Sequence, residues 1–188
     1  MNKPNTILMM GKTGSGKGTQ AERLAEHLGF KIFSSGDRFR ELRGKGDWLA
    51  ARMREEYDQG LLMPHWFASF LFIEGLLYTP HEQGLICEGT GRKKPEAELF
   101  EEVASWMRRD YRVFDIQISD AEAITRLQKR GRADGLDASV PKIRFRLEEY
   151  RNFTAPAIAF FKSIGKVKEI NGEQAPEAVF ADILKAIG

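Results

Sequence analysis

A glycine-rich run near the start of the chain carries the most specific chemical signal in the sequence. Residues 11–17 read GKTGSGK and match the first seven positions of the P-loop pattern, whose fixed residues here are Gly11, Gly16 and Lys17. Glycines let successive backbone N–H groups turn toward phosphate oxygens, and a following helix adds the positive end of its dipole. Lys17 supplies a mobile charge for the outer phosphates. A chance lysine in a glycine-rich turn is the alternative, but an apolar strand pattern before the run and a helical pattern after it favour a polyphosphate site.

The next residues bear on the metal that accompanies such phosphates. The P-loop pattern has Ser or Thr after its lysine, where the hydroxyl contacts Mg²⁺; here that residue is Gly18, and the hydroxyl comes one position later, at Thr19. Mg²⁺ dehydrates reluctantly, so we expect it to depend on phosphate oxygens and water. Glu88 follows the apolar run Leu85–Cys87 and offers a carboxylate to magnesium-bound waters. Its alternative role is a structural cap for the next loop.

Arginine is the second informative residue type. Two polyphosphates can be held together only if their mutual repulsion is neutralised, and catalysis of phosphoryl transfer is mostly positioning and charge neutralisation. Arginine stays ionised, and its planar fork binds two phosphate oxygens at once. Arg126 and Arg130 are four residues apart and so share one face of a predicted helix. Arg132 follows on a polar loop that could close over a bound nucleotide.

The same arginines have a simpler interpretation as surface charges in local ion pairs. On that interpretation Glu122 pairs with Arg126, and Glu149 or Tyr150 pairs with Arg146. The placement of the whole set beside a P-loop favours phosphate binding.

Short apolar runs alternate with helical segments, which predicts a parallel sheet with helices on both faces. Ligands of such sheets bind beyond the carboxyl ends of the strands, so the glycine-rich loop, Glu88 and Ser119 should converge there. Asp37 is expected to cap one short helix, and Ser119 or Asp120 another. Five strands are expected, at Thr6–Met10, Lys31–Phe33, Leu85–Cys87, Val113–Ile118 and Val167–Ile170.

Composition is that of an ordinary soluble domain. Of the 188 residues, 42% are hydrophobic and 30% charged, and the formal net charge of +2 gives no nucleic-acid signal. The most apolar helical stretch, Trp66–Leu77, is far shorter than the roughly 20 residues that a membrane span needs. The single cysteine, Cys87, cannot form a disulfide within the chain, which fits a reducing cytoplasm. We expect a cytoplasmic monomer without nucleic-acid or membrane partners.

Several strings of residues resemble the adenylate kinase family, in the order in which that family has them. Gly14–Thr19, which reads GSGKGT, resembles the family's P-loop, where a glycine after the lysine is tolerated. Ser34–Arg40 is similar to the segment that opens the monophosphate-binding helices. Gly60–Pro64 resembles the stretch lining the acceptor base, and Glu88–Arg92 stands at the place of the family's Asp-Gly-Phe-Pro-Arg. Ile124–Asp134 resembles the helix and lid of short-lid members, and Arg146–Pro156 resembles the helix returning from the lid.

The resemblance implies a P-loop NTPase fold of the α/β class, with a parallel five-stranded sheet, helices on both faces, a helical monophosphate-binding insert and a short lid. It implies one domain, 1–188, with a core at 1–33, 80–130 and 139–188, an insert at about 34–64 and a lid at about 131–138. The residues implied to bind ATP are Gly14, Ser15, Gly16, Lys17, Gly18, Thr19, Arg126 and Arg130, and those implied to bind the monophosphate are Ser35, Arg40, Arg92 and Glu96. The residues implied to act in catalysis are Lys17, Arg92, Arg130, Arg132 and Arg146. The implied cofactor is Mg²⁺, bound through waters on Glu88.

The implied activity is that of a nucleoside monophosphate kinase, with ATP and AMP giving two ADP. A kinase of the same family that prefers GMP or a pyrimidine monophosphate is one alternative. A nucleotide-binding regulator without turnover is another, because the chain departs from the family's residues at Thr13, Glu88, Thr90, Gly91 and Glu96. The retained Lys17 and the arginines favour an enzyme.

The acceptor base is where the residues and the resemblance disagree. Glu96 stands four residues after Arg92, where the family has glutamine. A glutamine amide can donate to adenine N1 and accept from the adenine amino group, whereas an ionised glutamate only accepts, which suits the two adjacent donors of guanine. Alternatively, Glu96 turns to solvent and leaves recognition to the backbone. We therefore expect AMP as the acceptor, with GMP as the alternative.

Overall fold

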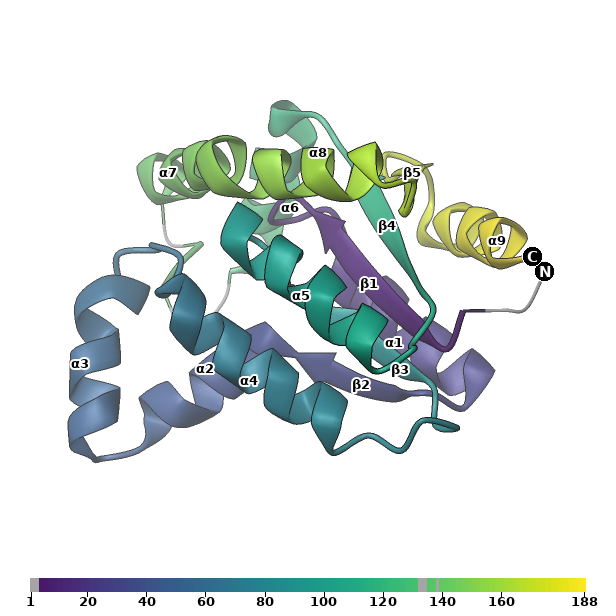
Figure 1. Ribbon diagram of the computed structural model, residues 1–188. Helices are drawn as coiled ribbons and strands as arrows, with labels where there is room; N and C mark the ends of the chain where they lie inside the picture. The colour runs from purple at the N-terminus through teal and green to yellow at the C-terminus, as the bar shows by residue number, and fades with distance from the viewer. Residues whose placement is uncertain (1–3, 132–134, 138) are drawn as a thin grey trace.

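The computed structural model describes residues 4–131, 135–137 and 139–188. Within these residues, five strands form one sheet in the spatial order β2-β3-β1-β4-β5 (Figure 1). Each paired strand runs parallel to its neighbour, which confirms the predicted parallel sheet. The strands are β1 Thr6–Gly11, β2 Lys31–Ser34, β3 Leu85–Glu88, β4 Tyr111–Gln117 and β5 Val167–Asn171.

Helices cover both faces of the sheet. Helices α1 and α9 pack on one face, and α4, α5 and α8 pack on the other. In the described part of the chain, no helix is long and apolar enough to cross a bilayer. The helices are α1 Lys17–Leu28, α2 Ser35–Gly44, α3 Trp48–Tyr57, α4 His65–Leu77, α5 Lys94–Trp106, α6 Asp120–Arg130, α7 Val140–Glu149, α8 Ala155–Ser163 and α9 Pro176–Ile187, with a π-helical turn, η1, at Tyr150–Thr154.

The central strand β1 explains why an apolar run without polar alternation marks this position. All of its residues are buried, and alternate side chains enter different clusters. Leu8 and Met10 pack with α4, α5 and α8, whereas Ile7 and Met9 pack with α1 and α9. A strand covered on both faces must be apolar on both faces. The result is a rigid layer from which the loops of the carboxyl edge emerge.

The strands end together at the edge where ligands were predicted to bind. In the sheet register, Glu88 of β3 lies beside Met9 of β1 and Ser34 of β2. Gly11 ends β1 with a φ of +132°, and a Cβ atom there would lie 2.4 Å from the carbonyl oxygen of Ile116 on β4. Only glycine fits at this point, where the chain leaves the sheet to form the P-loop.

Helices α2 and α3 stand away from the sheet, beside α4, at the lower left of Figure 1. The prediction that Asp37 caps the first of them is wrong. The Ser34 hydroxyl accepts the Asp37 N–H at 3.2 Å, so α2 begins earlier, at Ser35. Leu136, from the loop between α6 and α7, packs into the apolar cluster that these helices share with α4. The other buried members of that cluster are Leu42, Met53, Tyr57, Met63, Phe67 and Leu71.

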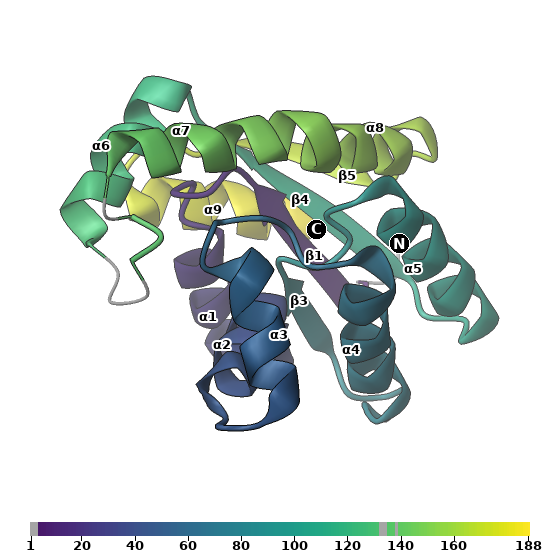
Figure 2. The same cartoon turned by 90° about the vertical axis from the view of Figure 1, so that its left-hand side faces the viewer.

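Helices α7 and α8 follow one another as one long rod across the top of Figures 1 and 2, with η1 between them. In η1 the N–H of Ala155 donates to the carbonyl of Tyr150, five residues back. Pro156 has no N–H, so an ordinary helical bond is missing directly after this turn. The wider π turn lets the rod continue past the proline. It carries Arg146 to the carboxyl edge of the sheet.

Candidate active site

A cavity of about 400 Å³ opens at the carboxyl edge of the sheet. The P-loop, the end of β3, the start of α5, and helices α2, α6 and α7 form its walls. Arg132 lies outside the described residues, and Ser15 is buried behind the loop. The cavity brings together nearly all of the predicted site, namely Gly14, Gly16, Lys17, Gly18, Thr19, Ser35, Arg40, Glu88, Arg92, Glu96, Arg126, Arg130 and Arg146.

The P-loop is shaped to present its backbone to an anion. The Ser15 N–H donates to the Lys12 carbonyl at 3.2 Å, which closes the loop on itself. Gly14 and Gly16 have φ angles of +83° and +89°, which favour glycine. Lys17 is the first residue of α1, so the unpaired N–H groups of the helix start at the cavity wall. These groups and the helix dipole form an anion site.

Lys17 lies among other positively charged side chains. Its Nζ donates to the Lys12 carbonyl at 3.2 Å and lies 3.9 Å from Oε1 of Glu88. Burial lowers the pKa of Lys17 to about 7; Glu88 opposes this shift, and the charges of Arg92, Arg146 and Arg130 add to it. The two carboxylates near these cations, Glu88 and Asp137, therefore do not balance the positive charge of Lys17 and the three arginines. A polyphosphate would, and it would restore the charge on Lys17.

Asp137 joins two of these arginines, Arg130 and Arg146, and was not among the predicted site residues. Its side chain is fully buried between α6 and α7. Arg130 donates to its Oδ2 from Nη2 at 2.7 Å and from Nε at 2.8 Å, and Arg146 donates to its Oδ1 at 2.7 Å. The predicted alternative pairing of Arg146 with Glu149 or Tyr150 is wrong, since Arg146 pairs with Asp137 and the carboxylate of Glu149 accepts the Leu62 N–H at 3.3 Å. Asp137 thus holds both guanidinium groups at the cavity.

Arg92 and Arg40 line the other side of the cavity. Arg92 packs over Gly89, where a Cβ atom would lie only 2.5 Å from its Nη2. Gly89 also has a φ of +71°, a backbone angle that favours glycine, and any side chain there would displace the Arg92 guanidinium. Arg40, on α2, is paired with Asp37 one turn earlier. Ser35 is buried, and its hydroxyl lies 3.1 Å from that of Thr90.

Glu96 is buried, so the prediction that it turns to solvent is wrong. Its exposed fraction is 3%, although it lies in the first turn of α5. Oε2 accepts the backbone N–H of Arg92 at 2.8 Å, in the manner of a side chain that caps its own helix. Burial raises its pKa to about 7, against the opposing effect of the N–H groups and charges of Arg92 and Lys93. Glu96 therefore presents to the cavity a carboxyl group whose protonated and ionised forms are close in free energy.

Glu88 fits the expected role toward Mg²⁺. It ends β3 at the cavity, with Oε2 accepting the Ser34 hydroxyl at 3.0 Å and Oε1 facing Lys17. Mg²⁺ bound with nucleotides keeps several waters and takes one or two carboxylates besides phosphate oxygens. Glu88, hydrogen-bonded on one oxygen and near the P-loop lysine, is a donor of this kind. Among the described residues, no group of three or more His, Cys, Asp or Glu side chains could hold a metal without phosphate.

A second hollow lies behind the P-loop. It measures about 290 Å³ and is lined by the start of α1, the turn before α9 and Arg126 of α6. Arg126 donates to Glu122 at 2.7 Å, as the surface-charge interpretation predicted, yet it also lines both cavities. The local ion pair and a place at the site are therefore compatible. A planar guanidinium at the rim can stack on a flat aromatic ring.

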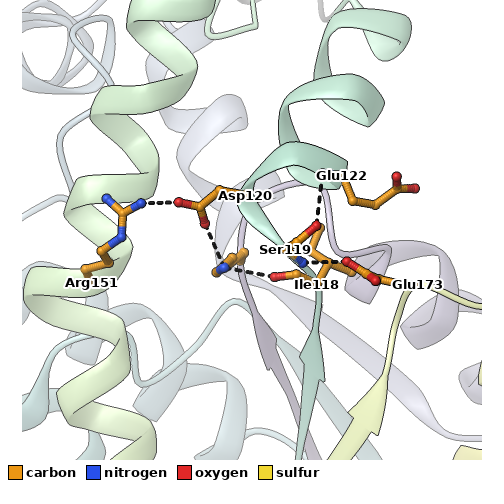
Figure 3. Close-up of polar contacts among 7 residues, drawn as sticks. Ile118, Ser119, Asp120, Glu122, Arg151 and Glu173 are labelled. Atoms are coloured by element: carbon orange, nitrogen blue, oxygen red, sulfur yellow. Dashed lines mark hydrogen bonds and ion pairs between the residues drawn. The ribbon is translucent and has the colours of Figure 1, made fainter.

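Lys12 ties the P-loop to the start of α6. Figure 3 shows the polar contacts of Asp120 and Ser119 at this point. Lys12 donates to Oδ1 of Asp120 at 2.7 Å and to the Ile118 carbonyl at 2.8 Å. The other oxygen of Asp120 pairs with Arg151 of η1. The hydrogen bond from Lys12 holds the pKa of Asp120 below its ordinary value. Ser119 caps α6, which settles the alternative left open by the sequence.

Comparison with known proteins gives a consistent result over the whole chain. The family model described as adenylate kinase matches residues 9–166. An adenylate kinase of Phocaeicola vulgatus is 34% identical over 183 residues, which are 96% of this chain and 97% of that protein. Those of Mycolicibacterium smegmatis and Thermus thermophilus are 33% identical over 183 residues and 32% identical over 190 residues. These matches cover 97% and 100% of this chain, and 98% and 100% of the respective relatives.

Proposed function

The chain belongs to the adenylate kinase family and is a nucleoside monophosphate kinase, and we propose that it transfers the terminal phosphoryl group of ATP to AMP, giving two ADP. The observation that carries this proposal is the convergence of Lys17, Arg92, Arg130 and Arg146 on one cavity beside the P-loop. Burial lowers the pKa of Lys17, and the charges of Arg92, Arg146 and Arg130 lower it further, so the cavity is arranged for more negative charge than the protein itself supplies.

The donor triphosphate belongs on the P-loop side. The backbone from Gly14 to Thr19 binds the inner phosphates, and Lys17 binds the outer ones. Arg130 and Arg146, held by Asp137, neutralise the transferring group, and Arg132 on the adjoining loop joins them when the loop closes. Arg126 stacks on the donor base at the mouth of the second hollow, whose floor includes Ser15.

The acceptor monophosphate belongs on the α2 and α5 side. Arg40 and Arg92 bind its phosphate from two directions, since they come from separate elements that line one cavity. Ser35 lies beside the base. Glu96, one turn beyond Arg92, is the ionisable group at the base end of this side. The insert at about 34–64 and the lid at about 131–138 close over both nucleotides and exclude water.

The reaction needs positioning and charge neutralisation more than proton transfer. An anionic oxygen of the acceptor phosphate attacks the terminal phosphorus of ATP, and the bond to the bridging oxygen of ADP breaks. The attacking oxygen carries no proton, so no general base is required. Lys17 and the arginines neutralise the charge that spreads over the transferring group. Glu88 would hold Mg²⁺ through bound water, and the ion would supply further charge neutralisation.

We place the enzyme in the cytoplasm as a monomer that binds ATP and a monophosphate but neither nucleic acid nor membrane. The buried, unpaired thiol of Cys87 and the modest net charge support this placement. A kinase that prefers GMP remains the second candidate, because Glu96 is buried at the site as a carboxyl group and not an amide.

A direct turnover assay tests the proposal. The purified protein is incubated with ATP, Mg²⁺ and each of AMP, GMP, CMP and UMP, and diphosphates are separated by chromatography. We expect two ADP per AMP consumed, with AMP the best acceptor. Tight nucleotide binding without diphosphate formation from any acceptor would overturn the proposal in favour of a regulator. A higher kcat/KM for GMP than for AMP at every pH would replace AMP by GMP as the acceptor.

A further inference from the structure

We propose that a single proton on Glu96 selects the acceptor base, the neutral carboxylic acid taking adenine and the ionised carboxylate taking guanine. The inference deepens the proposed function and rests on it. Glu96 is the buried ionisable group of the acceptor side that phosphate chemistry does not use. Its place in the site, its hydrogen bonds and the donor patterns of the two bases carry the argument.

Glu96 lies where a flat base would be bounded by apolar side chains. The Nζ of Lys93, three residues earlier, donates to the Leu62 carbonyl at 3.3 Å, so the segment 60–63 runs beside the start of α5. Leu61, Leu62 and Met63 line the same cavity as Glu96. Apolar side chains therefore border the Glu96 carboxyl group at this end of the cavity, and the other carboxylate there, that of Glu149, accepts the Leu62 N–H. A polar group so placed decides which hydrogen-bonding edge can be buried against it.

The backbone assigns different roles to the two carboxyl oxygens. Oε2 accepts the Arg92 N–H at 2.8 Å, and an oxygen that accepts this bond is the poorer site for a proton. The neutral acid therefore carries its proton on Oε1. In that form Glu96 offers one O–H donor and one acceptor side by side. In the ionised form it offers acceptors only.

These two forms match different purines. Adenine presents an acceptor, N1, next to its amino donor, which pairs with the donor and acceptor of the neutral acid. Guanine presents two adjacent donors, N1–H and its amino group, which pair with the two acceptors of the carboxylate. Each wrong combination leaves a buried polar atom unpaired or two lone pairs facing one another, which is costly at an enclosed site. The proton thus works as an exchangeable specificity element.

The surroundings hold the two forms close in free energy. Burial favours the neutral acid, whereas the N–H groups and charges of Arg92 and Lys93 favour the carboxylate, and the balance puts the pKa at about 7. Within the described residues, neither α4 nor α8 adds an ionisable side chain to the cavity lining. Other ionisable groups that line it are Asp37 and Arg40 from α2, Tyr57 from α3, Lys17 and Glu22 from α1, Glu88 from β3, Arg126 and Arg130 from α6, Arg146 and Glu149 from α7, and Tyr150 from η1.

The test is the ratio of kcat/KM for AMP to kcat/KM for GMP, measured from about pH 5.5 to about pH 8.5. The ratio cancels every titration that the two reactions share, including those of Lys17 and of the acceptor phosphate. Neither purine titrates in this range. We expect the ratio to fall by about tenfold or more as the pH rises, with its midpoint near the pKa of Glu96. A ratio that stays constant across the range would overturn the proposal.

Two variants separate base reading from a capping role. Glu96→Gln keeps a donor and an acceptor at every pH, so its ratio should stay high and lose its pH dependence. Glu98→Gln, on the exposed side of the same helix turn, should keep the wild-type profile. If Glu96→Gln retains the wild-type pH dependence, Glu96 only caps α5 and the proposal fails. If Glu96→Gln does not fold, the wild-type profile and the Glu98→Gln control still decide. Absence of diphosphate from any acceptor would instead overturn the proposed function itself.

Discussion

Two buried arginines at opposite edges of the sheet show that the same side chain can have two different roles. Arg109, at the amino edge, is 3% exposed and donates to Thr6 Oγ1 at 3.0 Å and to the Pro80 carbonyl at 2.7 Å. It also reaches the carbonyls of Thr79 and Gln83 at 3.2 and 3.1 Å. Arg146, at the carboxyl edge, donates to Asp137, and its pKa is lowered by burial and, against the effect of Asp137, by Arg130 and Arg92.

The difference lies in what surrounds each charge. Neutral carbonyl oxygens of the loop before β3 and the Thr6 hydroxyl converge on Arg109, which therefore ties that loop to the start of β1. Arg146 lies among other cations with one shared carboxylate, which leaves net positive charge in a cavity. A buried cation of the first kind stabilises the fold, whereas one of the second kind requires an anionic ligand. The predictions below test this division.

The largest effect is expected at the cation cluster. Lys17→Met should lower kcat by about a thousandfold or more, because it removes charge stabilisation of the transferring phosphoryl group. The thermal midpoint of the free protein should not fall, since the variant removes a buried charge that its surroundings disfavour. Coupled-enzyme kinetics and thermal unfolding measure the two quantities. Lys94→Met, at an exposed position of α5, is the control; near-normal kcat in Lys17→Met would refute the assigned role.

The opposite pattern is expected at the amino edge. Arg109→Met should lower the free energy of unfolding by about 3 kcal/mol, because several buried carbonyl oxygens lose their donor. The kcat of the folded fraction should stay within about twofold of wild type, since no phosphate is bound there. Urea unfolding and kinetics below the transition measure both. Arg108→Met, exposed and adjacent, should change stability by less than about 0.5 kcal/mol. A large loss of kcat in a stable Arg109→Met protein would break the division.

Substitution of Asp137 should have an intermediate effect on activity, because Asp137 holds two arginines of the site in place. Asp137→Asn should lower kcat/KM for ATP about tenfold, since Arg130 and Arg146 lose the charge that holds them together at the cavity. Glu122→Gln, which breaks the more exposed pair with Arg126, should change it by less than about twofold. Equal effects of the two variants, measured under the same conditions, would show that burial of the pair is irrelevant.

The sequence was sufficient for the features that depend on local chemistry. The P-loop is a backbone motif, and the five strands are apolar runs, so both could be predicted without knowledge of the fold. The bridging role of Asp137 could not, because it requires two helices to bring Arg130 and Arg146 to one buried oxygen pair. An acidic residue in the loop between two arginine-bearing helices was the available signal. The burial of Glu96 was missed because capping of α5 and the preceding loop together enclose it. The roles of Arg40, Arg92 and the other site residues stay predictions until the variants are measured.

The smallest expected effect is the uptake of less than one proton when ATP binds. In the free protein the pKa of Lys17 is about 7, so at pH 8 most Lys17 side chains are neutral. A bound triphosphate favours the charged form and raises this pKa, so binding of ATP with Mg²⁺ should take up about 0.9 proton at pH 8 and about 0.1 proton at pH 6. Calorimetric titration in two buffers with different ionisation enthalpies measures the uptake.

The sign follows from the direction of the shift. A lowered pKa in the folded protein means that the unfolded chain binds more protons between pH 7 and the ordinary pKa of lysine, 10.5, so the contribution of Lys17 to stability rises with pH across that window. Ligand binding reverses the shift, and the uptake must therefore grow as the pH rises from 6 to 8. Lys17→Met should abolish the uptake, whereas Glu96→Gln should retain it when ATP binds without an acceptor. Proton release on binding at pH 8, or uptake that survives in Lys17→Met, would show that Lys17 is not the group that gains a proton when the triphosphate binds.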